Sequence, residues 1–272
     1  MTMTSKTRFV IPNAFTSLSF LLGVWSICWA AGAFSPKNPS DAYAAIRMAA
    51  NFVIFCALLD KLDGFAARLM NASSEFGAQF DSLADLIGFG LAPGFALFFA
   101  YKNLAPEWFE SHTPIMIVAL SVYVLCAAMR LAKYNAMDSD SYPDYFVGMP
   151  TTFAGAINAV ILVLLCNYGF WATPNNPYIH LPLVIMVGTA ILMVAPIFLP
   201  KVKRRKNKFI NAFQAVTILL TYVAGFAMVF PEYLALNLVI YFVVGFGYGL
   251  LKKDEIVVEQ EQRVAAKAAA QG

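Results

Sequence analysis

Four aspartates lie within 26 residues of a strongly apolar stretch, at Asp60, Asp63, Asp81 and Asp85. The first two are three residues apart and the last two are four apart, so on helices each pair shares one face. Carboxylates that converge repel one another, and either protonation or bound cations relieve that repulsion. Ligands made only of oxygen suit hard divalent ions such as Mg²⁺, Mn²⁺ or Ca²⁺. The pattern therefore predicts a site that can hold two divalent cations.

Small residues accompany the acids. Gly64 and Ala67 follow the first pair, and Gly77 precedes Asp81 by four residues, which places it on the same helical stripe. Such residues leave backbone accessible to a bulky ligand, and the guanidinium of Arg68 can grip a phosphate. Helix packing through small residues explains any one glycine alone. In register with four acids, they favour a ligand site.

The composition indicates how these residues are positioned. The chain has 272 residues, of which 60% are hydrophobic and 13% charged, which is typical of an integral membrane protein. Its apolar runs are continuous rather than alternating, so strands are not expected. We predict an all-α polytopic membrane protein. Its eight expected helices cover residues 11–34, 42–60, 76–101, 113–134, 150–171, 178–199, 209–230 and 232–251.

The basic residues predict the orientation. If the N-terminus is cytoplasmic, every Lys and Arg except Lys37, Arg47 and Lys102 falls in a cytoplasmic segment. The net charge of +3 is then a topology signal and does not indicate nucleic-acid binding. The first apolar run is too long for a cleavable signal peptide and lacks a cleavage pattern. The sequence thus predicts an inner (cytoplasmic) membrane protein with both termini and the acidic site facing the cytoplasm.

Depth in the membrane also constrains the acids. Asp85 is expected about nine residues, or roughly 13 Å, inside the third helix. A carboxylate at that depth costs at least about 2.5 kcal/mol if it faces lipid. We therefore expect the acids to face an aqueous cavity that opens to the cytoplasm.

The spacing D-x2-D-G-x2-A-R-x8-G-x3-D-x3-D, from Asp60 to Asp85, resembles the signature of the CDP-alcohol phosphotransferases, integral membrane enzymes of phospholipid synthesis. Residues 11–16, IPNAFT, are similar to the P-N-x-x-T entry to that family's first membrane helix. The resemblance implies a six-helix core around a polar cavity, usually in a homodimer. We expect a family membrane domain at 1–200, a C-terminal transmembrane extension of about two helices at 201–251 and a polar cytoplasmic tail at 252–272.

The resemblance also implies roles for individual residues. Asp60, Asp63, Asp81 and Asp85 would bind the metals, and Asp85 would also act as general base. The CDP moiety would be bound by Asn13, Thr16, Gly64, Ala67, Arg68 and Gly77. This chemistry is reasonable, because two cations can hold a diphosphate during in-line displacement and a carboxylate can take the proton of an attacking alcohol. The donor would be CDP-diacylglycerol, with CMP as leaving group, and the cavity would open to membrane lipids for the acyl chains.

Two later segments concern the acceptor alcohol. Residues 130–135, RLAKYN, and 145–150, YFVGMP, resemble R-L-A-R-F-N and Y-F-x-G-L-P of the family's phosphatidylserine synthases, with departures at Lys133, Tyr134 and Met149. The resemblance implies L-serine, whose carboxylate needs a cation. The candidates for binding it are Arg130, Lys133, Asn135 and Thr151. Ordinary membrane anchoring by cytoplasmic cations is an alternative explanation for the two basic residues.

Other functions stay open at this point. Glycerol phosphate or inositol phosphate would want more positive charge, and choline would want an aromatic cage, for which Tyr134, Tyr142 and Tyr145 are available. Intramembrane acids also occur in divalent-metal and proton-coupled transporters. Transporters more often show repeated halves and a midplane site, whereas these acids cluster at one end of their helices.

Overall fold

A computed structural model gives the structure of the chain. It describes residues 10–32, 39–70, 74–137, 142–172, 176–201 and 208–271, with the side chains of 10–12, 39–40, 63, 65–70, 210 and 264–271 excepted. The elements in chain order are α1 (Val10–Ala30), α2 (Pro39–Met70), α3 (Glu75–Asp85), η2 (Leu86–Leu91), α4 (Ala92–Leu104), α5 (Pro106–Ala136), β1 (Tyr145–Val147), α6 (Thr151–Asn167), η3 (Phe170–Ala172), α7 (Leu181–Val194), β2 (Phe198–Pro200), α8 (Lys208–Phe226), α9 (Pro231–Leu251) and α10 (Lys253–Gln271).

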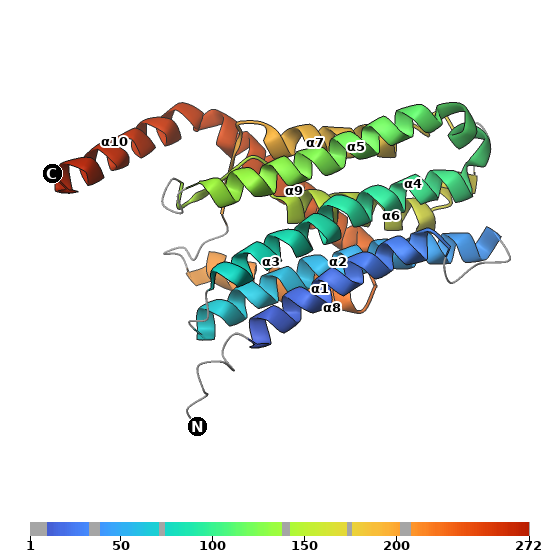
Figure 1. Cartoon of the computed structure of the whole chain (residues 1–272), viewed down its shortest axis with the longest axis horizontal. Helices are drawn as coiled ribbons and strands as arrows, with labels where there is room; N and C mark the ends of the chain where they lie inside the picture. Colours follow the sequence, from blue (N-terminus) through green and yellow to red (C-terminus); the bar gives the residue numbers. More distant parts are fainter. Residues whose placement is uncertain are drawn as a thin grey trace, which may run out of the picture.

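The helices form an elongated bundle (Figure 1). Within the described residues, five segments are long and apolar enough to cross a membrane, namely 13–30, 41–62, 75–104, 106–136 and 231–251. Three shorter apolar helices cover 151–167, 181–194 and 211–226. Each of the eight predicted spans overlaps one of these helices, so the prediction of an all-α polytopic membrane protein is confirmed.

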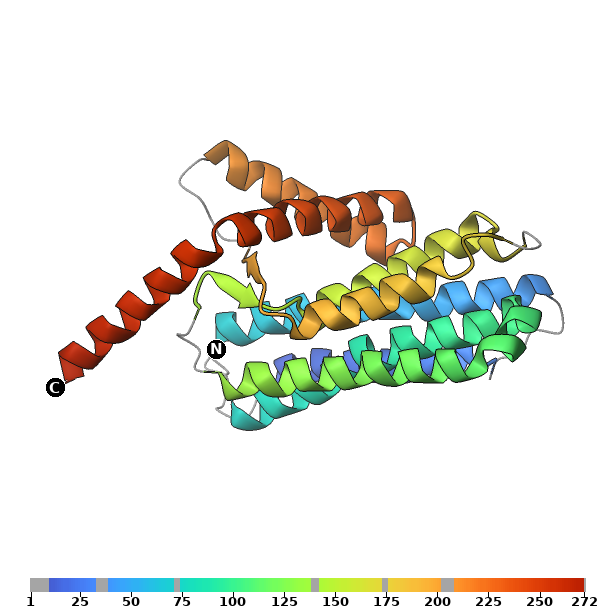
Figure 2. The same cartoon turned by 90° about the horizontal axis from the view of Figure 1, so that it is seen from above.

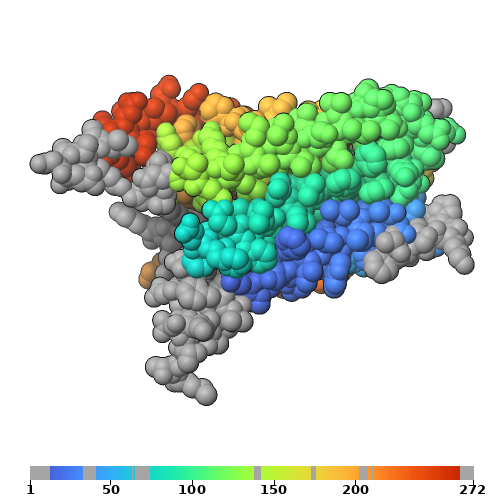
Figure 3. Space-filling model, in the orientation of Figure 1, coloured from blue at the N-terminus to red at the C-terminus, as the bar shows by residue number. Residues whose placement is uncertain are grey.

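The outer face of the bundle is apolar, as contact with lipid requires. Figure 3 shows α1, α3, α4 and α5 covering one face. Leu21 and Trp25 of α1 and Val118 and Leu125 of α5 are among the large apolar side chains that are exposed. Figure 2 shows α8 and α9 on the side of α6 away from α5.

The start of α1, the end of α2, the start of α3, the end of α5 and all of α10 lie at one end of the bundle (Figure 1). This is the end to which the sequence analysis assigns most of the basic residues. Helix α2 continues for ten residues beyond Asp60, to Met70, and is therefore longer than the predicted span of 42–60. As a result, Asp60 lies inside α2 rather than at its tip.

A π-helical segment, η2, interrupts the long third membrane span directly after Asp85. The buried Tyr123 of α5 donates a hydrogen bond of 2.8 Å from its hydroxyl to the carbonyl oxygen of Phe89. Gly155 of α6 packs so closely that a Cβ there would lie 2.9 Å from the Phe89 Cβ. Phe89 is therefore held by contacts from both α5 and α6, and η2 lies in the interior of the bundle. Single π-helical turns inside α-helices are frequent at functional sites.

Two short strands lie among the described residues, although the continuous apolar runs of the sequence predict none. β1 pairs with β2 in antiparallel register, with Tyr145 opposite Pro200 and Val147 opposite Phe198. The pairing continues where the amide of Gly148 donates to the carbonyl of Ile197. Gly148 has φ +77°, and a Cβ there would overlap the carbonyl oxygen of Met193, so only glycine fits. Three residues per strand are too few for a hydropathy pattern to reveal.

Candidate active site

Three of the four aspartates converge. One carboxylate oxygen from each of Asp60, Asp81 and Asp85 lies within 4.8 Å of the other two. All three residues are half-buried, and the Asp60 side chain is only 13% exposed. Asp63 follows Asp60 by three residues on α2, but its side chain lies outside the described residues. The structure therefore brings together the acids of α2 and α3 that the spacing predicts to meet.

Local sequence explains how α3 presents its two acids. Ser74 caps the helix, because its Oγ accepts a hydrogen bond of 3.0 Å from the Gly77 amide. From that start, Gly77, Asp81 and Asp85 follow at intervals of four on one face. η2 begins directly after Asp85. The two acids therefore lie in the regular α-helical part of this membrane span, and the buried residues that follow them lie in its π-helical part.

Asp60 has two neighbours besides the other acids. The ammonium of Lys61 lies 2.5 Å from Asp60 Oδ2. The hydroxyl of Thr152, at the start of α6, lies 3.4 Å from the same oxygen. Asp85 is close enough to the guanidinium of Arg130 for the opposite charges to attract. The acidic cluster is thus flanked by cations on two sides.

The donor set fits a hard divalent ion. Ion–oxygen bonds of about 2.1 Å hold ligand oxygens up to about 4.2 Å apart, and the longer bonds of Ca²⁺ extend this to about 5 Å. The 4.8 Å within which the three oxygens lie is inside the limit for Ca²⁺, and a small approach of the side chains would bring them inside the limit for Mg²⁺ or Mn²⁺. Only carboxylate oxygens are present in the cluster, which favours Mg²⁺, Mn²⁺ or Ca²⁺ over softer metals.

The residues proposed for the nucleotide lie beside the acids. Asn13 of α1 lies next to Gly77, since a Cβ on Gly77 would be 3.5 Å from Asn13 Oδ1. Thr16, one turn further along α1, is buried, and Gly64 is half-buried on α2. The side chains of Ala67 and Arg68 lie outside the described residues.

A cavity of about 160 Å³ is lined in part by Arg130, the residue whose guanidinium attracts Asp85. Its lining combines cations with aromatic rings and two further apolar side chains. The lining residues are Arg130, Lys133, Tyr134, Met137, Tyr142, Tyr145, Phe146, Val147 and Lys201. Because it contains three basic residues, the cavity suits an anionic ligand group, and we call it the acceptor pocket.

Two of the four predicted acceptor residues line the acceptor pocket, and the other two do not. Arg130 and Lys133 both line the acceptor pocket. Arg130 is buried, donates from Nε to the carbonyl of Met149 at 3.2 Å and stacks 4.9 Å from the centre of the Tyr134 ring. Asn135 instead donates to Ser82 Oγ of α3 at 2.8 Å. Thr151 is buried and does not belong to the lining residues.

One basic residue of the pocket lining was missed by sequence reasoning. Lys201 lines the acceptor pocket, where its ammonium donates to the carbonyl of Tyr142 at 3.2 Å and lies 5.2 Å from the centre of the Phe146 ring. In the sequence it opens the run KVKRRKNK, which reads as a topology signal. Of the two neighbouring threonines at the start of α6, Thr152 rather than Thr151 is the one whose hydroxyl lies 3.4 Å from Asp60 Oδ2.

Comparison with known proteins decides the family. Residues 9–198 match the family described as CDP-alcohol phosphatidyltransferase. The chain belongs to the CDP-alcohol phosphatidyltransferase family. The family predicted from the spacing of the aspartates is thereby confirmed, and the chain is an enzyme of the phosphotransferase class.

Several relatives in the CDP-alcohol phosphatidyltransferase family carry one name, CDP-diacylglycerol–serine O-phosphatidyltransferase. The protein of this name from Helicobacter pylori (strain ATCC 700392 / 26695) is 35% identical over 199 residues, which cover 73% of this chain and 75% of the relative. That from Methanocaldococcus jannaschii is 30% identical, with 74% and 82% covered. That from Mycobacterium bovis is 33% identical, with 71% of this chain and 61% of the longer relative covered.

Proposed function

We propose that this family member transfers the phosphatidyl group from CDP-diacylglycerol to the hydroxyl of L-serine, giving phosphatidylserine and CMP. The relatives named as serine phosphatidyltransferases support the acceptor. The observation that carries the chemistry is the convergence of the Asp60, Asp81 and Asp85 carboxylates beside a pocket lined by three basic residues.

Asp60, Asp63, Asp81 and Asp85 are the proposed metal ligands. Two divalent cations, Mg²⁺ or Mn²⁺, with Ca²⁺ as a further candidate, would hold the diphosphate and stabilise the charge that develops on its oxygens. Asn13, Thr16, Gly64, Ala67, Arg68 and Gly77 are proposed to contact the CDP moiety. The position of Asn13 against Gly77 supports this assignment, because it brings α1 to the stripe that carries the acids.

Asp85 is the proposed general base. Its carboxylate takes the proton of the serine hydroxyl while the serine oxygen bonds to the phosphorus that bears diacylglycerol. The bond from that phosphorus to the bridging oxygen breaks, and CMP leaves with the electron pair. Arg130 lies close enough to attract the Asp85 carboxylate, which would keep that carboxylate oriented toward the pocket.

The acceptor pocket distinguishes the candidate alcohols. Arg130, Lys133 and Lys201 offer positive charge to the serine carboxylate. The same charges repel the quaternary ammonium of choline, which counts against choline although Tyr134 and Tyr142 are available as aromatic walls. Glycerol phosphate and inositol phosphate are the competing anionic acceptors. The proposed serine contacts are those of Arg130 and Lys133, with Asn135 and Thr151 as weaker candidates.

The membrane setting is part of the proposal. We place the acidic cluster and both termini in the cytoplasm and the helices in the inner membrane, because the basic residues of the sequence fall in the segments assigned to that side. The described Lys61 pairs with Asp60 of the cluster, and Arg130, Lys133 and Lys201 line one pocket. The family match ends at residue 198, which supports a catalytic domain at 1–200, an extension at 201–251 and a cytoplasmic tail at 252–272. We also propose a homodimer, by analogy with the family.

Purified protein with CDP-diacylglycerol and Mg²⁺ tests the proposal. CMP release is measured with L-serine, choline, inositol phosphate and glycerol phosphate in turn, and serine should give phosphatidylserine. Product with another alcohol but not with serine would show that serine is not the acceptor. Metal uptake into sealed vesicles without CMP release would instead indicate a transporter.

Asp85→Asn tests the base. Removal of a general base should lower turnover by about 10²- to 10⁴-fold. Binding of CDP-diacylglycerol should stay largely intact, because the amide oxygen of asparagine can still bind a hard cation. The matched control is Asp41→Asn, at the opposite end of the membrane span in α2. Undiminished turnover by Asp85→Asn would rule out the role.

A further inference from the structure

One wall of the acceptor pocket contacts helices that follow the family-matched residues in the sequence. Tyr142, Tyr145 and Lys201 belong to the pocket lining. They lie on or beside β1 and β2, the only strands among the described residues. β2 in turn packs against α9, which follows the last matched residue by more than 30 positions.

The contact between α9 and β2 is unusually close. A Cβ on Gly249 would overlap the carbonyl oxygen of Phe198, and a Cβ on Gly245 would lie 3.2 Å from Leu199 Cδ2. One turn earlier on the same face, the Tyr241 hydroxyl donates to the carbonyl of Pro200 at 2.9 Å. Gly247, two residues from each glycine, has nothing within 4 Å. The contact face of α9 therefore repeats every four residues, as one helical stripe should.

The close contact extends through the strands to the pocket. β2 pairs with β1, and just after β2 the Lys201 amide donates to the carbonyl of Asp144 at 2.9 Å. Partial burial and a hydrogen bond with Tyr248 of α9 raise the pKa of Tyr145 to about 12, so its hydroxyl stays protonated. A shift of β2 away from α9 would thus move both Lys201 and Tyr145 within the pocket.

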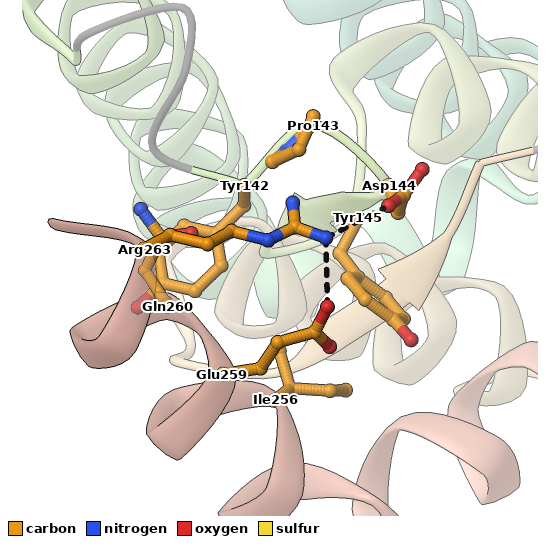
Figure 4. A pocket seen from close by; sticks show the side chains of 8 residues that line it. All are labelled: Tyr142, Pro143, Asp144, Tyr145, Ile256, Glu259, Gln260 and Arg263. Atoms are coloured by element: carbon orange, nitrogen blue, oxygen red, sulfur yellow. Dashed lines mark hydrogen bonds and ion pairs between the residues drawn. The ribbon is translucent and has the colours of Figure 1, made fainter. Parts of the chain in front are cut away.

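Helix α10 adds a second and weaker contact to the same wall. Figure 4 shows Arg263 of α10 reaching Asp144, 3.9 Å away, while it also pairs with Glu259 at 2.7 Å. Ile256 is buried beside Tyr142 and Tyr145. The Arg263 and Asp144 side chains are 45% and 43% exposed. An ion pair that is so exposed to water contributes little to stability. The α9 contact is therefore the one that fixes the wall.

We propose that α9, through Gly249 and Tyr241, is a positioning element of the acceptor pocket: it sets the place of β2 and hence of Lys201 and Tyr145, and so determines acceptor binding. Neither residue touches substrate in this proposal, and both act through the strands. The proposal rests on the assignment of that pocket to the acceptor. It gives the C-terminal extension a part in the reaction rather than a role in anchoring alone.

A glycine series on one helix tests the proposal. Gly249→Ala should raise the KM for the acceptor at least about fivefold, because overpacking must push β2 aside. The KM for CDP-diacylglycerol should change less than about twofold, since the acidic cluster is built by α2 and α3. Gly245→Ala should have an intermediate effect, and Gly247→Ala should behave as the native protein does.

The outcomes separate positioning from loss of the fold. An unchanged acceptor KM in Gly249→Ala, or equal rises in both KM values, would overturn the proposal. If Gly249→Ala cannot be purified folded, Tyr241→Phe decides: it keeps the ring against Phe153 and removes only the hydrogen bond to Pro200. It should raise the acceptor KM about two- to tenfold, and an unchanged value would overturn the proposal.

Failure of the proposed function would look different. The acceptor is first identified with the native protein, and if serine is not used, the series is run with whichever alcohol is used. The proposal concerns the pocket wall, so the split between the two KM values should persist with that alcohol. A native protein that transfers to no alcohol refutes both.

Discussion

Replacement of Lys61 by glutamine should strengthen metal binding and lower the Mg²⁺ concentration for half-maximal CMP release. Lys61 Nζ lies 2.5 Å from Asp60 Oδ2, so its ammonium competes with a divalent ion for the same carboxylate. The glutamine side chain of Lys61→Gln would keep the length of the native side chain roughly but remove its charge. The direction of the effect follows from like-charge repulsion between the ammonium and the ion.

The magnitude follows from distance and exposure. An ion on the far side of the Asp60 carboxylate would lie roughly 5 Å from Nζ, given usual ion–oxygen distances. Because the Lys61 side chain is 66% exposed, a dielectric constant of about 80 applies, and the repulsion is about 1.7 kcal/mol unscreened or about 0.9 kcal/mol in physiological salt. Since about 1.4 kcal/mol corresponds to a factor of ten, the half-saturating concentration should fall by about 4- to 16-fold.

The assay is a Mg²⁺ titration of CMP release after removal of metal with EDTA. Mn²⁺ binding, followed by electron paramagnetic resonance, gives a readout independent of turnover. Lys102→Gln, which removes the same charge near the opposite end of the bundle, is the matched control. A half-saturating concentration that stays equal to the control, or rises, would refute the competition between Lys61 and metal at Asp60.

Three further predictions concern the pocket and the core. Tyr123→Phe should lower the free energy of unfolding by about 1–3 kcal/mol, because it leaves the buried Phe89 carbonyl without its hydroxyl donor. The midpoint of thermal unfolding in detergent measures this effect. A midpoint equal to that of Tyr178→Phe, at an exposed tyrosine, would contradict it. Lys201→Gln should raise the KM for serine about tenfold with little change for CDP-diacylglycerol, and steady-state kinetics that show equal changes would count against a place for Lys201 at the acceptor. Asn135→Ala should change the serine KM less than Lys133→Gln does, since Asn135 is bonded to Ser82; the reverse order would show that Asn135 leaves Ser82 to bind the acceptor.

The membrane helices and the acidic cluster could be predicted because their signals are local. A run of apolar residues predicts a span by composition alone, and intervals of three or four place two acids on one face. The convergence of Asp60 with Asp81 and Asp85 needed only that α2 and α3 run in opposite directions and that both pack against α1. Their short separation along the chain favours opposite directions.

The acceptor pocket could not be predicted in the same way, because its wall is assembled from distant segments. Lys201 reaches the pocket only because β2 pairs with β1, and neither strand is long enough to show a period. Asn135 and Thr151 stand in the matching segments, yet the turn of α5 and the start of α6 direct them to other contacts. The direction in which a side chain points at the end of a helix depends on tertiary packing. That packing cannot be read from a single sequence.

The π-helical turn η2 makes one place in the third membrane span tolerant of a change in length. In an ordinary helix, one deleted residue rotates everything beyond it by about 100°. A π-helical turn holds about one residue more than an α-helical turn, because its hydrogen bonds run from residue i to residue i+5. Deletion of one residue within Leu86–Leu91 would therefore restore a regular helix, and the parts of the span on either side would keep their relative orientation. Deletion of one residue between Asp81 and Asp85, in the regular helix α3, would instead turn Asp81 away from Asp60, so the site tolerates a lost residue on one side of Asp85 and not on the other.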